Sequence, residues 1–470
     1  MNAQDALDAM DVLVVGAGPA GLALGIDLAR HGVDALVVEA GERLSPGSRG
    51  KGIQPRTQEV YADLGVLDAM RAAGGPYPPR QFWKNGEPVE SSPMFDAVAA
   101  DEGTPYTEPL MVAQWRTLEV LYARLRELGG RVGFGRAVTG LDQDERGVTV
   151  RFADGTTARA RYVVAADGGR STVRRAVGVG MTGESVDPGA FLVADLRVRG
   201  LDRDHWHTFL DDDGHGVALC PLAGTDDFQL GARLPEGTEV DLSLAGLRRL
   251  VAAYSRLDAA DVTEVRWASD FRPRAALADR FRVGRVFLAG DAAHVHSPAG
   301  GQGLNTSVQD AYNLGWKLAA VLAGRAPETL LDTYEEERRP NAAAMLGLST
   351  SVHRGEVRRG EATIQLGIGY WESSLTEETR AEPGPVRAGD RAPDGRNADG
   401  VRMFDAFGGP HWTLLAPAPV AGLGGLPAPG SYGPGVFLVR PDGYVGWAGE
   451  TTEGLRAYAA RAGALNADAT

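Results

Sequence analysis

The sequence contains one cysteine, Cys220, among 470 residues. An intramolecular disulfide is therefore impossible, and cysteine usage gives no sign of an oxidising compartment. The apolar runs fall short of the roughly 18 residues that a membrane-spanning helix needs. The first ten residues also lack the positive charge that precedes the apolar core of a secretory signal peptide. We therefore expect a cytoplasmic protein without a membrane span.

The sequence also lacks an excess of positive charge, since 48 Lys and Arg residues face 62 Asp and Glu residues, a net charge of −14. A nucleic-acid-binding protein would normally be basic, so we expect no nucleic acid partner. There is no Ser-His-Asp set, Walker loop or zinc-ligand spacing. His294 and His296 have no third ligand near in sequence, and we expect no metal site. The expected partner is a small molecule, bound by a monomer or a homodimer.

A glycine motif near the N-terminus, from Gly16 to Gly21, fits the pattern G-x-G-x-x-G. It lies between a short apolar run and a predicted helix, and a second apolar run follows, so residues 11–39 predict a βαβ unit. Gly16 permits a tight turn, Gly18 lets backbone N–H groups approach a pyrophosphate, and Gly21 allows close helix–strand packing. Glu39, at the end of the second strand, can accept hydrogen bonds from ribose hydroxyls. The motif predicts nucleotide binding but does not separate FAD from NAD.

Two further predicted strands end in an aspartate. One ends at Gly290-Asp291, ahead of the loop 298–303 and a long predicted helix over 304–322. The Asp291 carboxylate can hold the ribityl hydroxyls of a flavin, and the helix N-terminus can stabilise negative charge at N1 and C2=O of the reduced ring. The other strand ends at Asp167. Either aspartate alone could simply cap a helix, but together with the glycine motif they favour flavin binding.

These three motifs, in this order and separation, resemble the class A flavoprotein monooxygenases of the para-hydroxybenzoate hydroxylase fold. The most specific part is the run from Gly290 to Leu318, which reads G-D-A-A-H…P-x-G-G-Q-G-L-N…D-A-x-N-L-x-W-K-L. Within that family the chain looks most similar to the branch acting on aromatic polyketides, anthracycline- and tetracycline-type compounds and rifamycins. The resemblance covers residues 10–345 well and the part from Arg387 onward more loosely.

The resemblance implies a fold class and a domain organisation. The fold class is α/β: a Rossmann-like FAD-binding domain, an inserted antiparallel-sheet substrate domain, and a short C-terminal thioredoxin-like domain. The C-terminal part has no Cys-x-x-Cys and cannot carry out dithiol chemistry. The predicted boundaries are 1–75, 100–181 and 276–345 for the FAD-binding domain, 76–99 and 182–275 for the substrate domain, 346–385 for a helical segment and linker, and 386–470 for the C-terminal domain.

Two local predictions come from the texture of the sequence. The segments 131–139, 147–153 and 157–165 are separated by turn residues, which is typical of an antiparallel meander. Residues 376–400 are rich in Glu, Pro, Gly, Arg and Asp, which predicts a linker.

The resemblance also implies which residues touch the cofactor, a non-covalently bound FAD. Pro298 and Gly303 lie in the loop expected beside the flavin ring, and no catalytic base is assigned. The residues implied to bind FAD are Gly16, Gly18, Gly21, Glu39, Arg49, Gln114, Asp167, Asp291, Gly303, Leu304 and Asn305.

Candidate substrate residues come from the sheet domain and from the loop that faces the flavin. Aromatic and His side chains there suit an aromatic ligand, although a lone His or Trp in a sheet is more often structural. The candidates are Trp83, His205, Trp206, His207, Phe209, His215, Phe228 and His296.

The implied reaction is the hydroxylation of a bulky aromatic or polyketide-type substrate. In such relatives NADH or NADPH reduces the flavin, O2 adds to give a C4a-hydroperoxide, and its terminal oxygen passes to a nucleophilic ring. Because the chain has one G-x-G-x-x-G motif between a predicted strand and a predicted helix, we expect NAD(P)H to dock transiently on the FAD face.

Three other functions are considered on the same fold. One is a Baeyer–Villiger or decarboxylating flavin oxygenase, and another is a non-catalytic flavoprotein that binds a small molecule. The third, a flavin-dependent halogenase, needs a Trp-x-Trp-x-Ile segment and a catalytic lysine that are not found in this sequence, so it is disfavoured.

Overall fold

A parallel sheet forms the centre of the computed structural model, which describes residues 10–185, 189–297 and 300–465. The strand order is β18-β19-β10-β1-β2-β7, and β19, β10, β1 and β2 run parallel. Most of their residues are buried, as expected for apolar strands covered on both faces. The strands of this sheet are β1 (Met10–Val15), β2 (Ala35–Val38), β7 (Arg131–Gly133), β8 (Val138–Asp144), β9 (Gly147–Phe152), β10 (Thr157–Ala165), β18 (Arg282–Val283) and β19 (Val286–Leu288).

The predicted meander over 131–165 is only partly present. β7 lies at the other end of the sheet, where it pairs in parallel with β2. β8, β9 and the first half of β10 do form antiparallel pairs, but the second half of β10 pairs in parallel with β1 and β19. That half, Tyr162–Ala165, is fully apolar and buried. It therefore belongs to the centre of the sheet, whereas the alternating first half remains near the surface.

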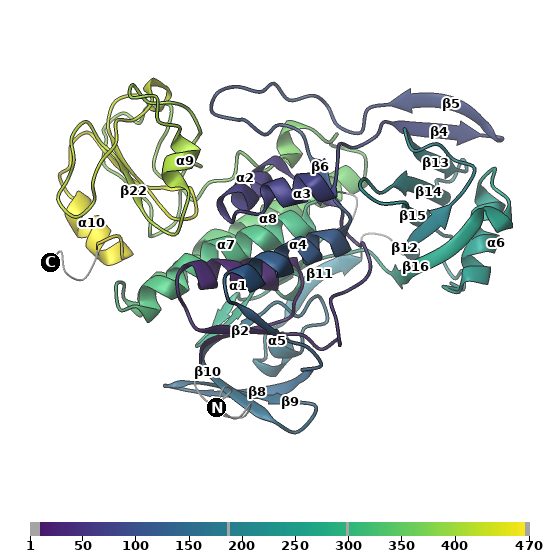
Figure 1. Ribbon diagram of the computed structural model, residues 1–470, viewed down its shortest axis with the longest axis horizontal. Coiled ribbons are helices and arrows are strands. Elements are labelled where there is room, and N and C mark those ends of the chain that lie inside the picture. Colours follow the sequence, from purple (N-terminus) through teal and green to yellow (C-terminus); the bar gives the residue numbers. More distant parts are fainter. Residues whose placement is uncertain (1–9, 186–188, 298–299, 466–470) are drawn as a thin grey trace.

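Helices pack on the sheet and on one another in the middle of the molecule (Figure 1). α1 begins at Pro19, a residue suited to the first helical position, and it packs against α4 and α7. α7 is buried along nearly all its length. The helices of this part are α1 (Pro19–Arg30), α2 (Pro55–Asp63), α3 (Leu67–Ala73), α4 (Gln114–Glu127), α5 (Thr172–Ala176), α7 (Gly303–Leu322) and α8 (Thr333–His353).

A second sheet lies to one side of this core, at the right in Figure 1. Its order is β16-β12-β15-β14-β13-β4-β5, and all pairs are antiparallel except β13 with β4. Helix α6 (Leu244–Tyr254) covers one face of the sheet with apolar residues. The strands are β4 (Arg80–Lys84), β5 (Glu87–Ser92), β12 (Phe191–Val198), β13 (Trp206–Leu210), β14 (Gly216–Pro221), β15 (Phe228–Arg233) and β16 (Val262–Phe271).

Two small sheets are separate from the central sheet and from the second sheet. One joins β3 (Gly52–Ile53) to β6 (Leu110–Met111). The other joins β11 (Met181–Ser185), β17 (Arg274–Ala278) and β20 (His294–Val295).

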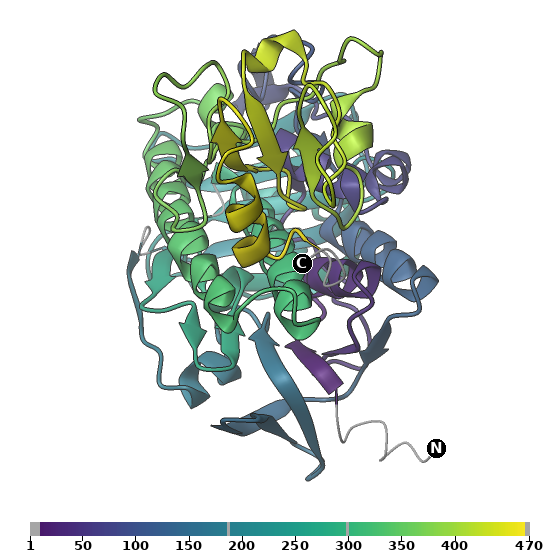
Figure 2. The ribbon, with the colours of Figure 1, turned by 90° about the vertical axis from the view of Figure 1, so that its left-hand side faces the viewer.

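The C-terminal part forms a separate sheet with the order β21-β24-β23-β22, shown in yellow and green in Figure 2. β21 pairs with β24 although it lies within the predicted linker 376–400. Buried side chains such as Arg380 and Ala388 hold that segment against the sheet, so it is not a free linker. The thioredoxin-like assignment stays a prediction. The elements are β21 (Glu377–Glu378), β22 (Thr413–Leu415), β23 (Val436–Val439), β24 (Val445–Gly449), α9 (Met403–Phe407) and α10 (Leu455–Ala462).

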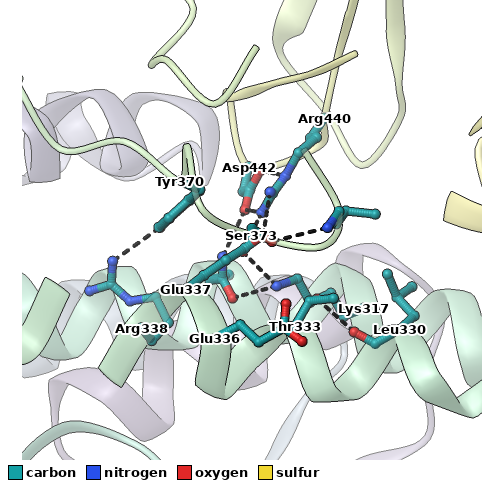
Figure 3. A network of polar contacts seen from close by, with 12 residues as sticks. Lys317, Leu330, Thr333, Glu336, Glu337, Arg338, Tyr370, Ser373, Arg440 and Asp442 are labelled. Atoms are coloured by element: carbon teal, nitrogen blue, oxygen red, sulfur yellow. Dashed lines mark hydrogen bonds and ion pairs between the residues drawn. The ribbon is translucent and has the colours of Figure 1, made fainter. Parts of the chain in front are cut away.

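A buried network of charges joins this C-terminal sheet to the central helices (Figure 3). Glu337 of α8 accepts hydrogen bonds from Lys317 of α7 at 2.7 Å and from Arg440, which follows β23, at 2.7 and 2.8 Å. Arg440 also pairs with Asp442. All four side chains are almost completely inaccessible to solvent. The C-terminal sheet is therefore anchored by groups that must stay paired, because an unpaired charge is costly in such a place.

Candidate active site

The glycine loop after β1 brings three elements into close contact. Gly16 has φ +109°, and a Cβ there would lie 2.3 Å from the backbone oxygen of Ala166 at the end of β10. A Cβ on Gly21 would lie 1.9 Å from the backbone oxygen of Gly16. Only glycine fits at these two positions, as the sequence motif predicts.

Gly18 differs from the other two glycines because no atom lies within 4 Å of where its Cβ would be. It is the N-cap of α1, and no side chain caps that helix or places a negative charge in its first turn. The space beside Gly18, at the start of the helix, is therefore open. A pyrophosphate fits such a place, because helix N-termini bind anions.

Glu39 lies beside the same loop. One carboxylate oxygen accepts from Ala17 N at 2.9 Å and the other from Gly41 N at 3.0 Å. Each oxygen keeps further acceptor capacity. Glu39 can therefore shape the loop and still accept hydrogen bonds from ribose hydroxyls.

The segment around Arg49 is fastened to the start of α4. Gly50 N donates to Gln114 Oε1 at 2.8 Å, and Gln114 N donates to Ser48 Oγ at 3.1 Å. Arg49 itself is exposed. Its charge opposes the rise in the pKa of Asp291, so these two predicted cofactor residues lie near each other.

The two strand-end aspartates have different surroundings. Burial raises the pKa of Asp291, opposed by His294 and Arg49, and within the described part of the chain its carboxylate accepts no hydrogen bond. A partly buried carboxylate without a hydrogen bond fits a hydroxyl-bearing ligand. Asp167 accepts from Thr172 N at 2.7 Å and Val173 N at 3.2 Å, which caps α5. Its second oxygen is buried and, among the described residues, unpaired. Asp167 is thus a helix cap that retains one free acceptor.

Asn305 connects the start of α7 to the segment that follows Arg49. Its Oδ1 accepts from Gln54 N at 2.8 Å, and its Nδ2 donates to Gly52 O and Gly301 O, both at 2.9 Å. Gly303 is the first residue of α7 and Leu304 is the second. Of the two residues predicted for the flavin loop, Pro298 lies outside the described residues.

A chain of buried polar groups packs beside the start of α7. Sequence reasoning did not identify this chain of groups. His296 and His294 share a hydrogen bond of 3.0 Å, and His294 contacts Asp310 of α7 at 2.5 Å. Asp310 also accepts from Gly290 N at 3.0 Å and from Arg338 at 2.8 Å. Burial opposes ionisation of Asp310, but His294 and Arg338 outweigh it and lower its pKa. His296 therefore lies on the cofactor loop, as a supporting residue.

The predicted substrate residues lie on two different faces of the second sheet, because successive side chains in a strand point in opposite directions. Trp206 lies on the face that packs against the FAD-binding part, with Lys51 Nζ 4.2 Å from its ring centre. Four others lie in or against the core under α6 and cannot reach a ligand on the opposite face. These four are Trp83, His207, Phe209 and Phe228.

The remaining two candidates also lie away from that inner face. His215 lies in the turn between β13 and β14, where its N–H donates to Asp211. With Asp211 and Asp213 it forms an exposed acidic group of the kind common on protein surfaces. His205 contacts Asp202 at 2.9 Å.

The inner face of the sheet carries polar groups that the sequence did not single out. Lys51 donates to Gln229, and Gln229 donates to the backbone oxygen of Ser48. Asp195, opposite Gln229 in the sheet, is fully buried and has no hydrogen-bond partner among the described residues. The only signal in the sequence is a lysine between two glycines, and that pattern is too common to identify a site.

An open cleft of about 720 Å³ adjoins this region. Tyr77 and Trp115 form part of its wall. Four arginines also line it: Arg116, Arg197, Arg203 and Arg266.

The parallel sheet with its glycine cradle, its free strand-end carboxylates and the second sheet packed over them define a flavin-binding oxidoreductase. The chain belongs to the FAD binding domain family, because the sequence pattern of that family matches residues 9–349. It is an FAD-dependent monooxygenase. Among the described residues no helix is long and apolar enough to cross a membrane.

Known proteins agree with this assignment over nearly the whole chain. A flavin-dependent monooxygenase of Mycobacteroides abscessus is 43% identical over 474 residues, covering 96% of this chain and 100% of the relative. A 12-dehydrotetracycline 5-monooxygenase/anhydrotetracycline 6-monooxygenase of Streptomyces rimosus is 36% identical, covering 95% and 97%. The crystal structure of aklavinone-11 hydroxylase with FAD and aklavinone superposes with a TM-score of 0.83 at 29% identity, covering 98% and 99%.

Proposed function

We propose that the protein hydroxylates a bulky aromatic or polyketide-type substrate, using FAD, O2 and NADH or NADPH. The observation that carries this proposal is the position of the second sheet. Its inner face, with Trp206, packs against the short segment that follows Arg49. That segment is hydrogen-bonded to Asn305. An aromatic ligand held there would lie against the flavin side of the protein. Relatives named for tetracycline-type and aklavinone substrates support the substrate class.

Bound FAD would supply the redox chemistry, by way of the C4a-hydroperoxide that the family resemblance implies. The protein supplies binding and orientation. The N-terminus of α1 and Glu39 would hold the nucleotide half, and Asp291 would accept hydrogen bonds from the ribityl chain. The second sheet would exclude water, which would otherwise allow the activated oxygen to be lost in side reactions.

The proposal is tested by measuring NADH and NADPH oxidation with a panel of aromatic polyketides, with the mass of each product recorded. We expect substrate to stimulate NAD(P)H oxidation and at least one product to gain one oxygen atom. Oxidation that no aromatic compound stimulates would instead favour a non-catalytic flavoprotein.

The same products separate hydroxylation from a Baeyer–Villiger reaction. Both add one oxygen atom, but a hydroxylase leaves the ring system intact, whereas a Baeyer–Villiger enzyme inserts oxygen beside a carbonyl. NMR of the product shows which bond has changed. Loss of CO2 would indicate the decarboxylating alternative.

A further inference from the structure

Asp310 of α7 is the centre of a buried ionic group that lies just after β19. Its side chain is inaccessible to solvent, and three donors hold it: Gly290 N at 3.0 Å, His294 Nε2 at 2.5 Å and Arg338 Nε at 2.8 Å. Desolvation opposes ionisation of Asp310, but His294 and Arg338 outweigh it and lower its pKa. An ionised carboxylate has no proton to donate, so the proton between the two side chains lies on His294 Nε2.

The neighbouring His296 determines what the other ring nitrogen of His294 does. His296 Nε2 lies 3.0 Å from His294 Nδ1. Its own Nδ1 lies 3.5 Å from Ser349 Oγ, and the carbonyl of Met345, four residues earlier on α8, accepts a hydrogen bond from the ring. A carbonyl only accepts, so the proton of His296 lies on Nδ1. Desolvation lowers the pKa of His296 well below its usual range, so the ring holds this one proton and Nε2 is bare.

Both ring nitrogens of His294 are therefore donors. Nε2–H donates to the carboxylate of Asp310, and Nδ1–H donates to the bare Nε2 of His296. A histidine that carries both N–H groups is an imidazolium cation. The hydrogen bonds thus define His294 as a positive charge, although its side chain is inaccessible to solvent.

Two cations, His294 and Arg338, share the single carboxylate of Asp310. Arg338 otherwise donates to the hydroxyl of Tyr370 and to a backbone oxygen. Tyr370 and Tyr334 stay neutral, because burial raises the pKa of both well above the usual range. Among the described residues, the group therefore has one positive charge in excess.

This excess charge acts on Asp291, which precedes His294 by three residues. Desolvation raises the pKa of Asp291, and the charge of His294 is the largest cause that opposes the rise. Arg49 acts in the same direction, but its side chain is exposed, so water and salt screen its charge. An ionised carboxylate accepts hydrogen bonds at both oxygens, whereas a protonated one has turned one oxygen into a donor.

We propose that His294 is a positioning residue of the FAD site: Asp310 keeps it as an imidazolium, and its charge keeps Asp291 ionised as an acceptor for the ribityl hydroxyls. Arg338 takes part by fixing the carboxylate of Asp310 from the side of α8. The proposal concerns cofactor binding, and it holds for any substrate that the enzyme oxidises.

The protonation of His294 is observed by NMR of the FAD-loaded enzyme labelled with 15N at histidine. The spectrum is recorded at about pH 8, where an ordinary imidazole with a pKa of about 6.5 is neutral. We expect one histidine with two protonated ring nitrogens, whose signals are missing in His294→Gln. Asp310→Asn should leave that ring with one proton, and this change assigns the signals if His294→Gln does not fold. A wild-type His294 with one proton at this pH overturns the proposal.

The affinity for FAD shows what the charge does. The dissociation constant of FAD is measured between about pH 5 and about pH 8. Without the charge of His294, the carboxyl of Asp291 takes up a proton at a higher pH. On acidification the affinity of His294→Gln should therefore fall at a higher pH than that of the wild type, by up to roughly ten- to hundred-fold. In the Asp291→Ala background, His294→Gln should change the affinity less than about two-fold, because it acts through Asp291.

His207→Gln is the matched control for the loss of a buried histidine. The ring of His207 is inaccessible to solvent and bonds to Trp83 and to the backbone oxygen of Asp202, within the second sheet. This variant should lose stability but keep the wild-type pH profile of FAD binding. A purely structural role of His294 would give both variants the same profile, or a loss of affinity that persists in Asp291→Ala. Either result overturns the proposal.

Discussion

Asp291 is the residue on which the flavin assignment can be tested most directly. Its carboxylate is partly buried and accepts no hydrogen bond from the described residues, so it is available to the ribityl hydroxyls. Asp291→Ala should weaken FAD binding roughly ten- to hundred-fold, because a hydrogen bond to a charged acceptor contributes about 1.5–3 kcal/mol. Equilibrium dialysis with FAD measures this. A dissociation constant unchanged within about two-fold, or about 0.4 kcal/mol, would place Asp291 away from the cofactor.

Asp195 gives a pH dependence with a definite sign. Burial raises the pKa of its carboxyl to about 6 in the folded protein, above its ordinary value of 3.8. Its contribution to stability is therefore fully present below the unfolded pKa and is lost as the pH rises through the folded pKa. Relative to Asp195→Asn, the wild type should lose about 2–3 kcal/mol between pH 4 and 7. Thermal unfolding of both proteins across this range checks the prediction, and parallel curves would contradict it.

Trp206 and Trp83 lie on neighbouring strands but on opposite faces of the sheet. Trp206→Ala should raise the substrate KM or uncouple NAD(P)H oxidation from product formation, with FAD content unchanged. Trp83→Ala is the matched control. Trp83 packs against Phe209 under α6, so its loss should lower stability and leave coupling intact. Equal coupling in the two variants would show that the pocket does not include Trp206.

At the scale of elements, the glycine loop separates a packing role from a binding role. Gly18→Ala meets no atom within 4 Å and should leave the melting temperature almost unchanged, while it weakens FAD binding by filling the space before α1. Gly16→Ala forces a Cβ to 2.3 Å from Ala166 O at a positive φ, so it should destabilise the fold itself. Calorimetry and FAD titration of both variants test this. Unimpaired FAD binding in Gly18→Ala would remove the loop from the cofactor site.

The motif that defines this loop was predictable from sequence because its contacts are local. Gly16, Gly18 and Gly21 act within one strand–turn–helix, and their spacing alone decides the geometry. The strand 157–165 was harder to place. Its outer half alternates and its inner half is apolar, and only pairing with β1 shows that the inner half is central. Residues 376–400 were predicted as a linker from their composition. Their strand, β21, has two residues, which is too short to give a strand pattern in the sequence.

At the scale of the whole molecule, Glu337 connects the C-terminal sheet to α7 and α8 (Figure 3). Glu337→Gln should cost about 3–5 kcal/mol, because it leaves Lys317 buried without its counter-charge and Arg440 with Asp442 alone. The partners lower the pKa of Glu337 despite its burial. Its stabilisation is therefore present above the unfolded pKa and is lost as the pH falls.

Chemical denaturation near neutral pH and in acid measures both effects. The neighbouring Glu336→Gln is the control, since Glu336 is exposed and, among the described residues, its side chain bonds only to Ser374. The wild type should lose its advantage over Glu337→Gln in acid, and the control should not differ from the wild type. If the two variants are equally stable near neutral pH, the network does not hold the C-terminal sheet in place.

The sequence by itself determined the cofactor class and predicted which residues would hold the cofactor. The glycine motif and the strand-end aspartates act through backbone geometry that a short segment specifies. The tertiary structure alone decided which face of the sheet each aromatic residue occupies. It also brought Lys51 to the ring of Trp206 and linked Arg338 through Asp310 to His294. These arrangements depend on strand register and on contacts between residues far apart in the chain, for which a single sequence carries no local signal.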